Sequence, residues 1–134
     1  MEQILIPTKG QIMERLEIIP EALKTNEISM LETQDRINEL DLQIKQIENS
    51  VMQKIIDEVE ILEGEEKPKK RFTNQQQREL AFEARIKDNT ARQQFIEQKN
   101  GELVDLQELK VGHDFLERKF KAARTMAELI VGRD

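Results

Sequence analysis

His113, the only histidine in the chain, is the side chain best suited to bind a metal or to change its charge near neutral pH. On a helix, Glu117 would stand one turn beyond it. Two ligands are too few for a metal centre, although an oligomer could bring several copies together. Because His113 also falls on an apolar heptad seam, we predict that it is a polar core residue that fixes the register of the facing helix, without a bound metal.

A second chemically interesting group is a basic segment near the middle of the chain. It consists of Lys67, Lys69, Lys70, Arg71, Phe72 and, further on, Arg78. Clustered cations on an exposed loop can neutralise phosphates, and an aromatic ring beside them can stack on an unpaired base. In the other interpretation, which we favour, the segment is a solvated turn whose lysines offset neighbouring glutamates while Phe72 covers the end of a hairpin.

The sequence contains no recognisable catalytic set. Cysteine and tyrosine are absent, and there is a single histidine. We find no glycine-rich phosphate loop and no nucleophile with a base close to it in sequence. No residues are therefore evident for covalent or acid–base catalysis. We therefore expect a protein that is not an enzyme and that uses no cofactor.

Composition indicates a narrow core and a reducing compartment. The 134 residues are 36% charged and only 4% aromatic, which leaves few bulky side chains for a wide core. The lack of cysteine fits a cytoplasmic location. The N-terminus has no signal-peptide pattern, and no apolar run approaches the roughly 18 residues of a membrane span. We expect a soluble, cytoplasmic protein that does not contact a membrane.

Charge is distributed unevenly along the chain, whose net charge is −6. Residues 1–66 carry 6 basic and 16 acidic side chains, whereas residues 67–134 carry 15 and 11. Opposite potentials favour pairing, so we expect the two halves to face each other. In particular, a basic run near the C-terminus is expected to meet Glu14, Glu17 and Glu21. This run consists of Arg118, Lys119, Lys121 and Arg124.

Helix-forming residues dominate, and the prolines and glycines predict where the helices break. We predict one all-α domain over residues 1–134. It should contain a short N-terminal segment (1–19), a long helix that starts with Pro20 in its first turn (about 20–63), a turn (64–73) and a kinked long helix (about 74–131).

Local polar residues predict how these elements start. The spacings Thr8–Gln11 and Thr73–Gln76 are those of capping boxes, in which the two side chains satisfy the first free amides of a helix. Asp88 and Asn89 compete for backbone hydrogen bonds and predict the kink, after which Thr90 is expected to cap the next segment.

Heptad spacing predicts that the two long helices pair. The first seam runs through Leu23, Met30, Ile37, Ile44 and Val51, with Leu40 and Ile47 between them. The second runs through Leu106, Leu109, His113, Leu116, Phe120, Ala123, Ala127 and Ile130. Folding the chain at the turn makes the helices antiparallel, so we predict a long coiled-coil hairpin.

Four apolar residues lie off this seam, and an isolated hairpin would leave them exposed. They are Ile28, Leu31, Leu42 and Ile56. Assembly of several copies into a helical bundle, or a protein partner, would cover them. We therefore expect a homo-oligomer and interpret these residues as an oligomer or partner surface.

The order of breaks and heptads resembles that of small helical proteins encoded by bacteriophages and prophages. The resemblance rests on the helix start at Pro20–Leu23, the turn at Lys69–Asn74, the break at Lys87–Thr90 and the heptads that end at Phe115–Phe120. Such proteins are often encoded among recombination and replication genes. The resemblance implies an accessory role near single-stranded DNA or its protein machinery, in the cytoplasm of a bacterial host, and it identifies no functional residue.

Three functional hypotheses follow. The first is a protein-interaction module, an accessory factor of phage-type DNA recombination or replication. The second is direct binding of single-stranded nucleic acid through the basic segment. The third is a structural scaffold in which coiled-coil geometry is itself the function.

Overall fold

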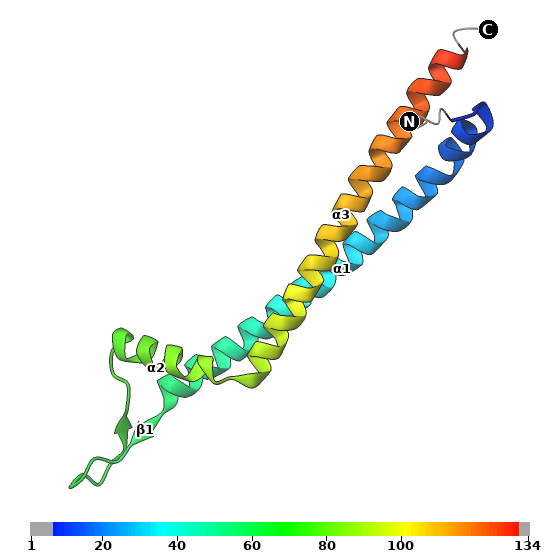
Figure 1. The fold of residues 1–134 in the computed structure, drawn as a ribbon. Helices are drawn as coiled ribbons and strands as arrows, with labels where there is room; N and C mark the ends of the chain where they lie inside the picture. Colours follow the sequence, from blue (N-terminus) through cyan, green and yellow to red (C-terminus); the bar gives the residue numbers. More distant parts are fainter. Residues whose placement is uncertain (1–6, 132–134) are drawn as a thin grey trace. The chain divides into compact units, whose positions relative to one another are not determined.

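The computed structural model describes residues 7–131 and confirms an all-α fold. Within this range the helices are α1 (Lys9–Asp57), α2 (Gln75–Lys87) and α3 (Thr90–Val131), and two short strands, β1 (Val59–Glu60) and β2 (Lys69–Lys70), form a hairpin (Figure 1). No helix within these residues has both the length and the apolar character needed to cross a bilayer.

The chain divides into two compact units. The terminal unit contains the described residues up to Asp35 and from Leu103 onward, and the central unit contains Arg36–Glu102. In the terminal unit the first part of α1 lies beside the last part of α3 (Figure 1). In the central unit the rest of α1 pairs with the start of α3, and the strands and α2 complete the unit.

Helix α1 begins earlier than the sequence predicts. The predicted capping box is confirmed, because Thr8 N donates to Gln11 Oε1 (2.9 Å) and Gln11 N donates to Thr8 Oγ1 (3.2 Å). The prediction of a separate segment before Pro20 is wrong, since α1 runs through this proline without a break.

Burial on both sides of Pro20 explains why the helix continues. Ile12 and Ile19 are 2% and 4% exposed, in step with the predicted seam. An interior proline costs about 3 kcal/mol, whereas burying an isoleucine contributes roughly 1.5–3 kcal/mol. The exposed Pro20 ring lies on the solvent side, where the lost hydrogen bond is least costly.

Helix α1 also ends earlier than predicted, at Asp57 rather than near residue 63. Residues 58–71 form an antiparallel β-hairpin in which Val59 pairs with Lys70 and Glu60 with Lys69. Arg71 N donates to Glu58 O (3.0 Å) and closes its base. The β-branched residues that follow Asp57 favour a strand once a second strand is available, so the turn predicted over 64–73 is part of a longer hairpin.

The start of α2 and the break before α3 are confirmed, with different capping residues. Asn74, not Thr73, is the N-cap of α2, and its side chain accepts from Gln77 N at 2.8 Å. Asn89, not Thr90, accepts from Arg92 N at 2.9 Å at the start of α3. In both places the asparagine is the stronger cap, because its short amide oxygen reaches the free amides more readily than threonine's.

The seam of the terminal unit is apolar with polar interruptions. Leu106 and Ala123 of α3 are buried, as are Ile12 and Ile19 of α1. Thr33 is 2% exposed and donates to Ser29 O within its own helix (2.8 Å). Asn26 faces Gly112, and its Oδ1 is buried without a hydrogen-bond partner among the described residues. Such seam positions cost stability but restrict the register.

The glycines allow a direct test of this helix packing. A Cβ at Gly101 would meet nothing within 4 Å, so Gly101→Ala should raise the free energy of unfolding by about 1 kcal/mol through helix propensity alone. Gly64→Ala is the matched control, since Gly64 has φ +85° and should give no such gain. Urea unfolding followed by circular dichroism measures both. A loss of stability in Gly101→Ala would contradict the solvent-facing placement of residue 101.

Candidate functional site

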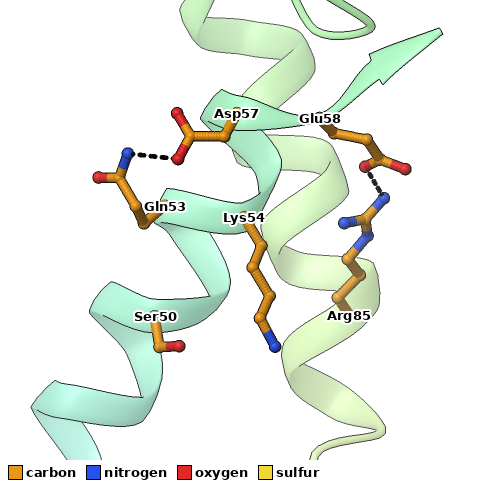
Figure 2. Close-up of a pocket in the computed structure, with 6 residues that line it drawn as sticks. All are labelled: Ser50, Gln53, Lys54, Asp57, Glu58 and Arg85. Atoms are coloured by element: carbon orange, nitrogen blue, oxygen red, sulfur yellow. Dashed lines mark hydrogen bonds and ion pairs between the residues drawn. The ribbon is translucent and has the colours of Figure 1, made fainter.

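The base of the β-hairpin is organised around one carboxylate. Glu58, just after α1, accepts from Arg71 Nη1 at 3.0 Å and pairs with Arg85 of α2. Figure 2 shows Glu58 and Arg85 meeting across a shallow depression. The depression is lined by Ser50, Gln53, Lys54, Asp57, Glu58 and Arg85. The hydrogen bond from Arg85 is the main cause that lowers the pKa of Glu58, so the group is held as an anion between two cations.

The aromatic ring of the basic segment belongs to the same base. Phe72 lies under two guanidinium groups, with Arg71 at 5.3 Å and Arg85 at 5.5 Å from the ring centroid. Arg78 Nε donates to Phe72 O at 3.4 Å. These three predicted nucleic-acid contacts therefore make intramolecular contacts that join the hairpin to α2.

The lysines of the hairpin differ in whether they form an ion pair. Lys69 pairs with Glu65 at 2.9 Å, as the solvated-turn interpretation expects. Lys67 and Lys70 are exposed and have no ion-pair or hydrogen-bond partner among residues 7–131. Residues 58–72 contain five acidic and four basic side chains, so the hairpin as a whole is not a positive patch.

Apolar side chains also reach solvent on the central unit. Val59, Ile61 and Leu62 of the hairpin are 54%, 68% and 46% exposed. Leu80 of α2 is exposed too, beside a shallow groove lined by Glu60, Arg71, Phe72, Gln77, Leu80 and Ala81. Because the sequence predicts a helix through residue 63, which includes Val59 and Leu62, it does not reveal this apolar hairpin.

The predicted off-seam residues are mostly exposed. Ile28 and Leu31 in the terminal unit and Leu42 in the central unit are 48%, 67% and 56% exposed, whereas Ile56 is half-buried. A longer apolar stripe was missed on the opposite helix. Val104, Val111, Phe115, Ala122 and Leu129 of α3 are all exposed, and we call them the α3 outer stripe. Counting heptad positions c and f, opposite the seam, would have found it.

The basic run on α3 does not pair as predicted. Within residues 7–131, Arg118, Lys119, Lys121 and Arg124 form no ion pair with Glu14, Glu17 or Glu21. Instead Lys119 lies over the Phe115 ring, 5.9 Å from its centroid. The physical reason is heptad position: residues 118 and 121 lie on the side of α3 away from the seam, out of reach of α1.

His113 bridges the two helices of the terminal unit. Its Nε2 lies 3.0 Å from Glu27 Oε1 on α1, and its Nδ1 lies 3.7 Å from Glu117 Oε1. The hydrogen bond to Glu27 is the largest cause that raises the pKa of His113, and the charges of Glu117 and Asp114 act in the same direction. The contact with the facing helix is the kind of bond that the predicted register role requires.

The same corner holds the residues best placed for a metal. Donor atoms of His113, Asp114 and Glu117 lie within 4.8 Å of one another. All three come from one turn of α3, and His113 Nε2 is already engaged by Glu27. Glu27 and Glu117 are therefore the ion-pair partners of His113, the residue of this group whose charge changes near neutral pH.

Lowering the pH should accordingly stabilise the folded terminal unit through protonation of His113. A raised folded-state pKa means that the stabilisation is fully present below the unfolded value of about 6.5 and is lost as pH rises through the folded pKa. The melting temperature of the wild type should therefore fall from pH 6 to 8.5 more than that of Glu27→Gln. Glu32→Gln, at an exposed position with no ion pair in the described chain, is the control. Parallel curves for wild type and Glu27→Gln would contradict the assignment.

The hairpin base should respond to acid in the opposite sense. Glu58 has a lowered pKa, so its contribution is present above about 4.3 and is lost as pH falls through the folded value. Glu58→Gln should increase amide hydrogen exchange of residues 58–72 at pH 7, measured by mass spectrometry. Glu63→Gln, which breaks no ion pair between described residues, should not. Equal exchange in both variants would show that Glu58 does not hold the base.

Known proteins give no further guide to these surfaces. Comparison with protein-family models, curated proteins and solved structures finds no match to this chain. The function is therefore argued from the residues and contacts described above.

Proposed function

We propose that this chain is a non-enzymatic protein-interaction module. The observation that carries the proposal is the balance of apolar side chains in residues 7–131. Fifteen large apolar side chains are exposed, whereas only seven apolar residues are buried. Scattered exposed apolar residues are ordinary, but stripes and clusters of them mark surfaces that another molecule covers.

The apolar hairpin is the surface that we assign to a protein partner. Val59, Ile61 and Leu62 project from a two-stranded ribbon whose base is held to α2 by Glu58. A fixed base presents these side chains at a defined place, which lowers the entropy lost on binding. Lys67 and Lys70 beside them would add steering toward an acidic partner.

The resemblance to phage-encoded helical proteins supports a narrower proposal. In that setting the partner would be a protein of a recombination or replication apparatus, met in the cytoplasm of the bacterial host. Self-association belongs to the same proposal, because copies that pack together would cover apolar residues that one copy leaves in water.

Direct nucleic-acid binding is the second candidate. The exposed, unpaired Lys67 and Lys70 favour it, whereas the contacts that already occupy Arg71, Phe72 and Arg78 weigh against it. A structural scaffold is the third candidate. In that role the coiled coil would only hold other molecules at a fixed distance from one another.

Paired capture and DNA-binding experiments separate these candidates. Tagged wild type should capture a protein from nuclease-treated host lysate. The variant Ile61→Ser/Leu62→Ser should no longer capture this protein, whereas Lys67→Ser/Lys70→Ser should still capture it. In fluorescence anisotropy with labelled single-stranded and duplex DNA at 50 and 200 mM salt, the wild type should show no salt-sensitive binding. Salt-sensitive binding that the lysine variant abolishes would replace the proposal with the second candidate.

A further inference from the structure

Helix α3 of the terminal unit is apolar on two opposite sides. Its seam side buries Leu106 and Ala123 against α1. On the far side, Val104, Val111, Phe115 and Leu129 of the α3 outer stripe are 58%, 60%, 64% and 59% exposed. A two-helix layer can cover only one side of each helix, so the outer stripe is left for a molecule outside the chain.

The stripe has a property that favours a second copy of itself. Its spacing is nearly the same when read in either direction about a point between Leu116 and Glu117. If a second α3 lies antiparallel about that point, Val104 faces Leu129 of the other copy and Val111 faces Ala122. Each contact then occurs twice, as a two-fold interface requires.

The same antiparallel arrangement also brings oppositely charged side chains together and places an aromatic ring beside a cation. Phe115 would face Arg118 of the second copy, a contact of the cation–π type. Asp114 and Lys121, which flank the stripe, would meet each other across the interface in two symmetric ion pairs. Both are exposed, and neither has an ion-pair partner among residues 7–131.

The length of the contact is adequate for a stable pair. Residues 104–129 rise about 39 Å at 1.5 Å per residue, which gives seven turns of matched helix. Exposed ion pairs contribute little each, so the apolar stripe supplies most of the affinity and the two Asp114–Lys121 pairs favour this register.

We propose that two copies of this chain associate through their α3 outer stripes as an antiparallel, two-fold symmetric helix pair. The inference rests on the self-association part of the proposed function and adds its surface and orientation. It leaves the apolar hairpin of the central unit free for a different protein.

Charge exchange tests the register. Asp114→Lys and Lys121→Asp should each weaken self-association by about tenfold, because each sets like charges opposite one another twice. The double variant D114K/K121D should restore it, and so should an equimolar mixture of the two single variants. Molar mass from light scattering across a concentration series gives the dissociation constants. Failure of both the double variant and the mixture to recover would overturn the proposed register.

Phe115→Glu tests the apolar stripe. This variant should be monomeric, with unchanged helix content by circular dichroism because residue 115 lies away from the seam. Wild type that is monomeric at all accessible concentrations, or Phe115→Glu that associates like wild type, would overturn the interface. Capture of a partner protein by Phe115→Glu would show that the proposed function stands independently.

Cross-linking tests the direction with no background, because the chain has no cysteine. V111C mixed with A122C should form a disulfide-linked heterodimer on mild oxidation, whereas V111C alone should not cross-link. Efficient cross-linking of V111C to itself would indicate a parallel pair and would overturn the antiparallel arrangement.

Discussion

The stability of this fold depends on one narrow seam, where each long helix contributes a single stripe of side chains to the facing helix. In the terminal unit that stripe buries Ile12, Ile19, Leu106 and Ala123, but it also contains Asn26, Thr33 and His113. Polar residues in a two-helix seam reduce the apolar area buried and make shifted registers costly. The seam thus gives a defined alignment at modest stability, and it leaves the outer sides of both helices uncovered.

Local sequence rules predicted most of the fold and failed where a distant segment decided the outcome. The cap at Thr8 and the break at Asp88–Asn89 depend on neighbours within four residues, and both were predicted. Pro20 predicts a helix start because proline inside a helix has a clear local penalty, whereas the compensating burial of Ile12 and Ile19 depends on packing beyond the segment itself. The strand at Val59 was missed because its partner, Lys70, lies eleven residues further along.

The candidate site likewise combines features that local sequence predicts with features that depend on distant contacts. Sequence alone located the cations near residue 70, but it could not assign them partners, because Arg71 meets Glu58 from 13 residues away. Because Arg71, Phe72 and Arg78 make internal contacts, the segment is the fixed base of an apolar hairpin. Lys67 and Lys70 of this hairpin have no partner among the described residues. The α3 outer stripe, in contrast, is a purely local pattern. Its residues occupy positions opposite the seam, so the heptads that predict helix pairing do not include them.

The unequal charge of the two halves has different consequences in the two units. In the central unit, acidic residues of the first half meet basic residues of the second half, since Asp41, Glu48 and Glu58 pair with Lys99, Arg92 and Arg85. The pair Arg36–Glu102 has the opposite order of charges. Water screens such partly exposed pairs, so they align the helices more than they stabilise them. In the terminal unit Arg118 and Lys121 of the basic run lie on the side of α3 away from the seam. Charges that find no partner within a unit remain available to another molecule, and here they flank the exposed α3 outer stripe.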